Sequence, residues 1–180
     1  MKRVFDALGN AMLLLVAVMM AVWLGPQIKR QWSPAASGNV VSSYKAGESA
    51  PHLEAVQYSD SGRTLLMFVR STCHFCTESM EFYRRIADSQ AHRSGQLKLV
   101  AVSIDSPSVT EAYLHDNHLV VDQVVSYTIE SEIKVSATPT LIAVDRTGTV
   151  EGLWVGKKPA SGEKDIEAAL YRPVRAASVN

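Results

Sequence analysis

The chain has only two cysteines, and both lie where one apolar pattern gives way to another. Residues 64–69 form an apolar run of strand length, typical of a strand that is buried on both faces of a sheet. Residues 76–89 then repeat apolar side chains at helical spacing. Cys73 and Cys76 occupy the turn between these two segments. A buried strand that leads directly into a helix indicates an α/β fold.

The rest of the sequence repeats this alternation of strand-length runs and helical segments. Residues 145–148 form a turn sequence that ends in Gly and lies between two strand-length runs, so a hairpin is predicted there. The predicted elements are a short strand at 53–57, a strand at 97–104, a helix at 108–118, a hairpin formed by 140–144 and 150–155, and a helix at 162–171.

The N-terminal segment differs from the remainder of the chain. Residues 7–25 carry no charge, and as a helix they would span about 28 Å, close to the thickness of the hydrocarbon core of a bilayer. A cleaved signal peptide is the alternative, but its cleavage needs small residues directly after the apolar run, where this chain has Pro26 and Gln27. The sequence therefore favours an uncleaved membrane anchor over residues 1–30.

Composition divides the rest of the chain into three parts. Residues 31–48 are rich in Ser, Ala and Gly and are predicted to be a flexible tether. The folded domain is expected over residues 49–172, with a short tail at 173–180. Basic residues stand on both sides of the apolar run, so the positive-inside rule does not decide the orientation of the anchor.

Charge and cysteine content exclude several classes of protein. The chain carries 18 basic and 18 acidic side chains, so no excess of basic residues favours binding to nucleic acid. Residues 1–30 hold four basic groups and one acidic group, which leaves 14 basic and 17 acidic groups beyond them, a net charge of −3. Two cysteines three positions apart close too small a loop to brace a fold. They are therefore interpreted as reactive.

The position of the cysteine pair suggests its chemistry. Two intervening residues bring the sulfurs close enough for a reversible disulfide, and the start of a helix offers free amides that favour a thiolate. Cys73 is thus the predicted attacking group. His74, next to it in the sequence, adds positive charge when protonated and would stabilise the thiolate further.

Metal sites are the alternative for a cysteine pair. Structural zinc needs four ligands, and the chain has no second cysteine pair, although His74, His115 and His118 could complete a site. Covalent haem attachment needs His directly after the second cysteine, where this chain has Thr77. A copper- or zinc-binding module stays open as an alternative, whereas the redox interpretation requires no metal and no organic cofactor.

Taken together, these motifs resemble the thioredoxin-like superfamily, and most closely its membrane-anchored TlpA/ResA-type thiol-disulfide oxidoreductases. The resemblance covers roughly residues 46–171 and implies a thioredoxin-like fold, with a central mixed sheet flanked by helices. It is carried by residues 47–51, residues 66–68, the Cys73-His74-Phe75-Cys76 turn and residues 135–140, which include Thr138-Pro139.

The resemblance also implies roles for individual residues. Cys73 attacks a protein disulfide and Cys76 resolves the mixed disulfide. The proline that matches Pro139 is cis in the family and lies against the cysteine pair, so the backbone of Thr138 would pair with an extended substrate. Phe75 is a further expected substrate contact.

Three positions depart from the family pattern, one of them Thr72, where the family usually has Trp before the first cysteine. Thioredoxins proper have a buried aspartate where this chain has Met67, and the TlpA/ResA-type branch often has Glu where this chain has Ser79. The base that deprotonates Cys76 is therefore not evident from the sequence. Glu78 is the nearest candidate for that base. Glu78 and His74 are also the candidates for tuning the stability of the Cys73 thiolate.

The expected activity is thiol-disulfide exchange with protein disulfide or dithiol substrates. The resemblance favours a reductase whose domain lies on the extracytoplasmic, periplasmic side of a membrane and is supplied with electrons by a membrane redox partner. A thiol peroxidase of the same fold is the alternative. Its nucleophile normally has Thr or Ser three residues earlier, where this chain has Arg70.

Overall fold

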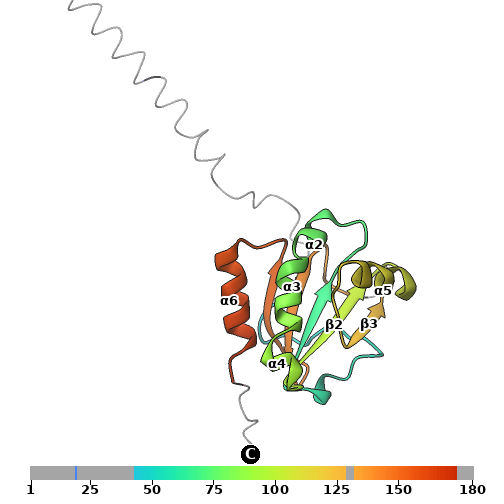
Figure 1. The fold of residues 1–180 in the computed structure, drawn as a ribbon. Coiled ribbons are helices and arrows are strands. Elements are labelled where there is room, and N and C mark those ends of the chain that lie inside the picture. The colour runs from blue at the N-terminus through green and yellow to red at the C-terminus, as the bar shows by residue number, and fades with distance from the viewer. Residues whose placement is uncertain (1–18, 20–42, 129–131, 174–180) are drawn as a thin grey trace, which may run out of the picture. The chain divides into compact units, whose positions relative to one another are not determined.

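The computed structural model describes residues 19, 43–128 and 132–173. In this part of the chain five strands form one sheet in the order β3-β2-β1-β4-β5 (Figure 1). The strand β1 pairs in parallel with β2 and antiparallel with β4, so the sheet is mixed, as predicted. The strands are β1 (Arg63–Phe68), β2 (Leu97–Ser103), β3 (Gln123–Ser126), β4 (Thr140–Asp145) and β5 (Val150–Val155).

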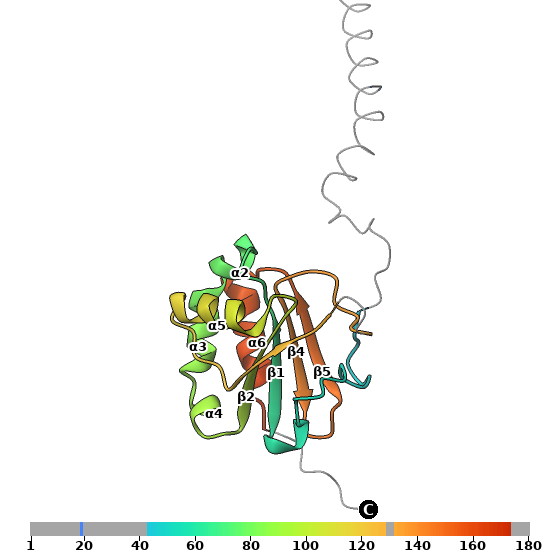
Figure 2. The ribbon, with the colours of Figure 1, turned by 90° about the vertical axis from the view of Figure 1, so that its right-hand side faces the viewer.

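The helices cover one face of this sheet. Figure 2 shows them together on one side of the strands, where their buried side chains join a single helix-side cluster. These helices are α2 (His74–Glu78), α3 (Met80–Ala87), α4 (Gln90–Arg93), α5 (Pro107–Asp116) and α6 (Ala160–Leu170). The short 3-10 helix η1 (Tyr58–Asp60) is separate from them, and its Tyr58 packs against the cluster on the opposite face. The helix-side cluster consists of Leu65, Met67, Val69, Cys76, Met80, Phe82, Tyr83, Ile86, Leu97, Leu99, Ala101, Leu114, Leu119, Leu141, Ala143, Ile166 and Leu170.

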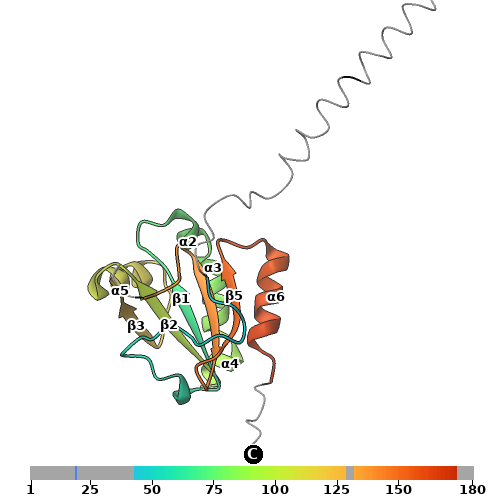
Figure 3. The same ribbon diagram turned by 180° about the vertical axis from the view of Figure 1, so that it is seen from behind.

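The opposite face is covered by irregular chain. The segment that begins at residue 43 crosses it, as Figure 3 shows from behind. Successive side chains of a strand point to opposite faces, so Met67 enters the helix-side cluster and Phe68 the other one. This loop-side cluster consists of Tyr44, Leu53, Val56, Leu66, Phe68, Val100, Val102, Val125, Ile142, Val144 and Val150.

The folded part extends into the segment predicted as a tether. Tyr44 is buried, the Gly47 amide donates to the Val150 carbonyl (2.8 Å), and the Val150 amide donates to the Glu48 carbonyl (2.9 Å). Two backbone hydrogen bonds and one buried aromatic ring therefore attach residues 44–48 to β5. The predicted anchor at 1–30, apart from Met19, and residues 31–42 lie outside the described residues. No helix of the described part is long and apolar enough to cross a membrane.

The predicted strand at residues 53–57 is wrong. The Val56 amide donates to the Leu53 carbonyl (2.9 Å), so the chain turns there instead of extending. This turn places both side chains in the loop-side cluster, and η1 follows. Apolar residues three positions apart thus reach the core through a turn rather than through a strand.

The predicted helix at residues 76–89 begins earlier and is interrupted. It starts at His74 and breaks at Ser79, whose hydroxyl donates to the Phe75 carbonyl (2.8 Å) and whose amide donates to the Cys76 carbonyl (3.1 Å). The bond to a carbonyl three residues back tightens the turn and separates α2 from α3. The strand at 97–104, the helices at 108–118 and 162–171 and the hairpin are confirmed with bounds that differ by one or two residues.

A buried arginine joins the sheet to the end of the last helix. Arg63, at the start of β1, is 5% exposed, and its guanidinium forms an ion pair with Glu151 of β5. The same group donates to the carbonyls of Leu170 and Arg172, where α6 ends. Helix-terminal carbonyls lack partners inside their own helix, so Arg63 satisfies groups that burial would otherwise leave unpaired.

Arg63→Ala should therefore lower the free energy of unfolding. Breaking a buried ion pair costs roughly 3–5 kcal/mol, and we expect about 2–4 kcal/mol here because Glu151 is partly exposed and regains water. Urea unfolding of the full-length chain in detergent measures the loss. Arg146→Ala, in the exposed hairpin turn, is the control and should change the value by less than about 0.5 kcal/mol. Equal stability of the two variants would contradict the role given to Arg63.

Candidate active site

The cysteine pair lies beyond the carboxyl end of β1. Two hydrogen bonds fix the connecting loop: the Val69 amide donates to the Val102 carbonyl (3.0 Å), and the Ser71 amide donates to the Asp105 carboxylate (2.8 Å). The bond from Ser71 also holds the pKa of Asp105 below its usual value. The carboxylate that follows β2 thereby anchors the loop that leads to the cysteines.

Cys73 is the N-cap of α2, and its sulfur takes part in two hydrogen bonds. The Cys76 amide donates to the Cys73 sulfur at 3.2 Å, in the way that a capping oxygen accepts from an amide in the first turn of a helix. The Cys73 thiol in turn donates to the Thr138 carbonyl at 3.4 Å. The sulfur is thus held between the start of α2 and the loop before β4.

These surroundings favour the thiolate of Cys73. Burial raises the pKa of this thiol, but hydrogen bonds from the Cys76 and Thr138 side chains and from the Cys76 and Phe75 amides outweigh it, so the pKa is lowered overall. The side chain is only partly buried. Cys73 therefore combines access with an increased thiolate fraction, the two properties that a nucleophilic cysteine needs.

The second cysteine has the opposite environment. Cys76 is fully buried in the helix-side cluster, and burial, followed by the neighbouring Cys73, raises its pKa to about 12. Both cysteines are free in this structure. The pair thus consists of one accessible sulfur that favours the thiolate and one buried sulfur that stays a thiol at neutral pH.

The loop before β4 lies beside the pair, as the resemblance implies. The peptide bond between Thr138 and Pro139 is cis. In the register of the sheet Phe68 faces Thr140, so this loop meets the chain that continues from β1 toward Cys73. The Pro139 carbonyl accepts from the Gly156 amide at 2.7 Å, which ties the loop to the end of β5.

Two predicted site residues form the outer face of α2. The Phe75 ring is 56% exposed, and the His74 side chain is 78% exposed. Their ring centroids lie 5.7 Å apart in a tilted arrangement. An accessible apolar side chain therefore follows the accessible Cys73 by two positions.

Glu78 pairs with Lys157 and His74 and not with either cysteine. Its carboxylate accepts from Lys157 at 3.0 Å and lies 3.3 Å from the His74 imidazole. The hydrogen bond from Lys157 is the largest cause of a lowered pKa at Glu78, and the nearby charges add to it. A carboxylate with a lowered pKa is a weaker base, so Glu78 is poorly suited to deprotonate Cys76. Its position favours an electrostatic interaction with the His74 imidazole instead.

The structure adds tyrosines that the sequence interpretation did not include in the site. Tyr83 of α3 is buried in the same cluster as Cys76, and the hydroxyl of Tyr113 in α5 lies 3.1 Å from the Thr77 hydroxyl of α2. Charge on the cysteines raises the pKa of both tyrosines, after the larger effect of burial. The seven-residue interval from Cys76 to Tyr83 is the only sequence signal for this proximity.

The other histidines considered as metal ligands lie elsewhere on α5 and its end. His115 is exposed and faces Asp116 at 3.6 Å, and His118 adopts a positive φ of 52° just beyond the helix. Within the described ranges no three side chains of His, Cys, Asp or Glu gather closely enough to hold a metal ion. The described geometry gives the cysteine pair no third ligand.

The contrast between the two sulfurs predicts selective alkylation. Because a lowered pKa provides thiolate at lower pH, iodoacetamide should modify Cys73 of the reduced chain near neutral pH and leave Cys76 unmodified. Cys76→Ser should react about as fast as the wild type, whereas Cys73→Ser should react at least roughly tenfold more slowly. Peptide mass spectrometry identifies the modified residue. Equal labelling of both cysteines in the folded chain would contradict the assignment.

Comparison with known proteins places the fold. A family model described as thioredoxin-like matches residues 62–150. No curated protein matches the chain in sequence. Similar solved structures include the thioredoxin domain of a thiol-disulfide oxidoreductase from Bacteroides vulgatus, with 15% identity and a TM-score of 0.54 over 71% of this chain and 99% of that one.

Two further structures resemble the chain to a similar degree. A thiol:disulfide interchange protein of the thioredoxin family from Chlorobium tepidum has 17% identity and a TM-score of 0.53, covering 71% of this chain and 99% of its own. A peroxiredoxin-like protein from Aquifex aeolicus has 14% identity and a TM-score of 0.52, covering 71% and 89%. At such identities the likeness establishes the fold. The chain therefore has the thioredoxin-like fold, and the family model matches residues 62–150 of it.

Proposed function

We propose that the protein is a thiol-disulfide oxidoreductase that uses Cys73 and Cys76 as its redox-active pair. The observation that carries the proposal is the inequality of the two sulfurs: one is accessible with a lowered pKa, and the other is buried with a raised pKa. Exchange needs an attacking thiolate and a second thiol that waits until the mixed disulfide has formed. The thioredoxin-like fold and the names of its structural neighbours agree with this activity.

The proposed reaction proceeds in two displacements. The Cys73 thiolate attacks one sulfur of a partner disulfide, and the other partner sulfur leaves as a thiolate that takes up a proton. Cys76 then displaces the partner from Cys73 and closes the intramolecular disulfide. The partner gains two electrons, the cysteine pair loses two, and neither a metal nor an organic cofactor takes part.

The proposed substrate site surrounds the accessible sulfur. Phe75 offers an exposed ring on one side, and Thr138 and Pro139 line the other, with the Thr138 carbonyl already hydrogen-bonded to Cys73. An extended protein segment could therefore contact the apolar ring while its disulfide meets the sulfur. The chemistry of this surface fits a protein disulfide better than a small charged molecule.

Direction and location are proposed from the resemblance to TlpA/ResA-type proteins. In this proposal residues 1–30 anchor the chain, and the domain works as a reductase on the extracytoplasmic, periplasmic side of the membrane. A reductase must be reduced again after each turnover, so a membrane redox partner would return two electrons to the Cys73–Cys76 disulfide. The alternative direction is an oxidant, which the lowered pKa of Cys73 also permits.

Cysteine variants test the proposed activity. The reduced full-length chain should reduce insulin disulfides, Cys73→Ser should lose essentially all activity, and Cys76→Ser should accumulate mixed disulfides through Cys73 because the resolving thiol is absent. Non-reducing electrophoresis detects these adducts, and His115→Ala is a matched surface control. Hydrogen peroxide consumption by a chain that leaves insulin intact would instead favour the peroxidase, and stoichiometric metal uptake without either activity would favour the binding module.

His74 should raise the reduction potential of the pair. His74 directly follows Cys73 in the sequence, and its imidazole, when protonated, would stabilise the reduced, thiolate form. His74→Ala should therefore lower the potential, by about 10–30 mV, where 30 mV corresponds to about a tenfold change in the equilibrium constant. A glutathione titration at slightly acidic pH measures the shift, with His115→Ala as control. An unchanged or higher potential in His74→Ala would exclude this role.

A further inference from the structure

Resolution of a mixed disulfide requires Cys76 to act as a thiolate, and the site described so far contains no base for it. Cys76 is fully buried, and the carboxylate nearest to it in the sequence, that of Glu78, pairs with Lys157 and His74. Met67 occupies the position of the buried aspartate of thioredoxins and lies in the same cluster as Cys76. Hydrogen bonds from the Arg70 backbone and the Thr138 side chain lower the pKa of this thiol, but burial outweighs them and the pKa stays raised. A further donor is therefore needed to stabilise the charge that develops on the sulfur.

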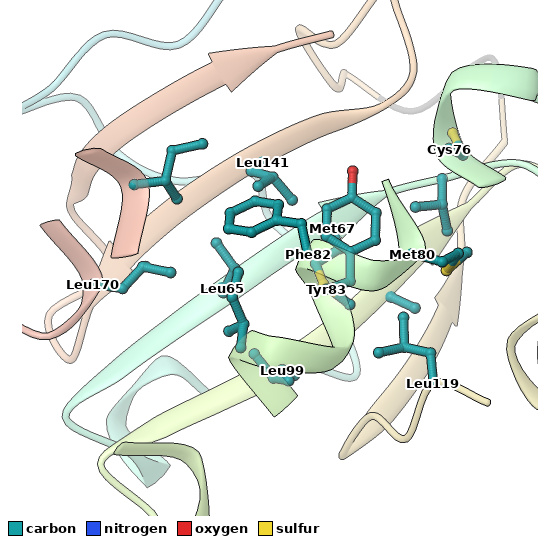
Figure 4. Close-up of a cluster of buried hydrophobic side chains, with 14 of the residues drawn as sticks. Leu65, Met67, Cys76, Met80, Phe82, Tyr83, Leu99, Leu119, Leu141 and Leu170 are labelled. Carbon is teal, nitrogen blue, oxygen red and sulfur yellow. The ribbon is translucent and has the colours of Figure 1, made fainter. Parts of the chain in front are cut away.

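Tyr83 is placed to act on Cys76. Seven residues separate the two, which is close to two helical turns, and the Tyr83 amide continues the helical hydrogen bonding by donating to the Ser79 carbonyl (3.1 Å) across the break. Long side chains lean toward the N-terminus of their helix, so the Tyr83 hydroxyl reaches back toward α2. Figure 4 shows the ring inside the helix-side cluster, with its oxygen directed to the end where Cys76 lies.

The surroundings of Tyr83 keep its hydroxyl protonated. The residue is 2% exposed, and burial raises the pKa of the hydroxyl far above its ordinary value, more than a hydrogen bond with the Ser79 side chain lowers it. Negative charge on Cys76 or Cys73 raises this pKa further. Tyr83 is therefore a hydrogen-bond donor at every working pH and never a competing anion.

We propose that the Tyr83 hydroxyl donates a hydrogen bond to the Cys76 sulfur as this sulfur becomes a thiolate and attacks the mixed disulfide. The bond between Cys73 and Cys76 forms while the bond between Cys73 and the partner breaks, and the partner sulfur leaves with the electron pair. The proton released by Cys76 reaches the leaving sulfur through solvent. This inference rests on the proposed function and assigns the step that Tyr83 assists.

Tyr113 provides a matched comparison. Among the described residues the titratable groups that face Cys76 are Cys73, Tyr83 from α3 and Tyr113 from α5. Tyr113 is only half-buried, and its hydroxyl is paired with Thr77. Removing either tyrosine hydroxyl keeps the aromatic ring, but only the loss at Tyr83 should take a donor from the Cys76 thiolate and leave it with the Arg70 backbone and the Thr138 side chain alone.

The aromatic disulfide DTNB separates the two displacements in the reduced full-length chain. Attack by Cys73 releases a first equivalent of the coloured thiolate, and attack by Cys76 on the resulting mixed disulfide releases the second. Tyr83→Phe should leave the first phase within about twofold of wild type. It should slow the second about tenfold or more, because a hydrogen bond to a charged group is lost. The pH at which the second phase reaches half its maximal rate should also rise.

Each outcome bears on one claim. A second phase in Tyr83→Phe that matches wild type, or slowing of equal size in Tyr113→Phe, would overturn the role of Tyr83. Absence of the first phase in the folded wild type would instead overturn the proposed function. Should Tyr83→Phe fail to fold, a fluorinated tyrosine at position 83, whose hydroxyl is a stronger donor, decides the question: a faster second phase supports the inference, and an unchanged one overturns it.

Discussion

The hydrogen bond from the Cys76 amide to the Cys73 sulfur is the contact on which the rest of the site depends. It forms because Cys73 has an extended backbone at the N-cap (φ −86°, ψ 107°) while Cys76 already lies in the first helical turn. An interval of three residues then brings amide and sulfur together. The same geometry directs the Cys76 side chain into the helix-side cluster. One local constraint thus accounts for both the accessible sulfur and the buried one.

The sheet holds this contact from two sides. The parallel strands β1 and β2 end at the same edge, so Asp105, after β2, can accept from Ser71 in the loop that leads to Cys73. The strand β4 runs antiparallel to β1 and therefore begins where β1 ends, which brings Thr138 to the same edge. Because the sheet is mixed, the loop that leaves β1 and the loop that enters β4 meet at the Cys73 sulfur. The site is thus a consequence of strand order as much as of the cysteine spacing.

Local patterns in the sequence predicted most of the fold and the position of the cysteine pair, the centre of the candidate site, within it. The strands β1 and β2 are continuous apolar runs, and the cysteine pair marks the start of a helix, so both could be located without tertiary information. The predictions failed where contacts between residues far apart in the sequence determine the local structure. Residues 53–57 form a turn, and this turn is what lets Leu53 and Val56 both pack into the loop-side cluster. The carboxylate of Glu78 is held by Lys157, which lies 79 positions away in the sequence. No periodicity reveals such a pairing.

The chemistry of the buried cysteine also explains why a neutral donor suits this core. A charged carboxylate in place of Met67 would have to be desolvated in an apolar cluster, at a cost of several kcal/mol. A tyrosine hydroxyl carries no charge in the resting state, so its burial needs only a hydrogen-bond partner. In a low dielectric its interaction with a transient thiolate is nevertheless strong. In the proposed mechanism, a core that lacks a buried base resolves the mixed disulfide by stabilising the thiolate only while it exists.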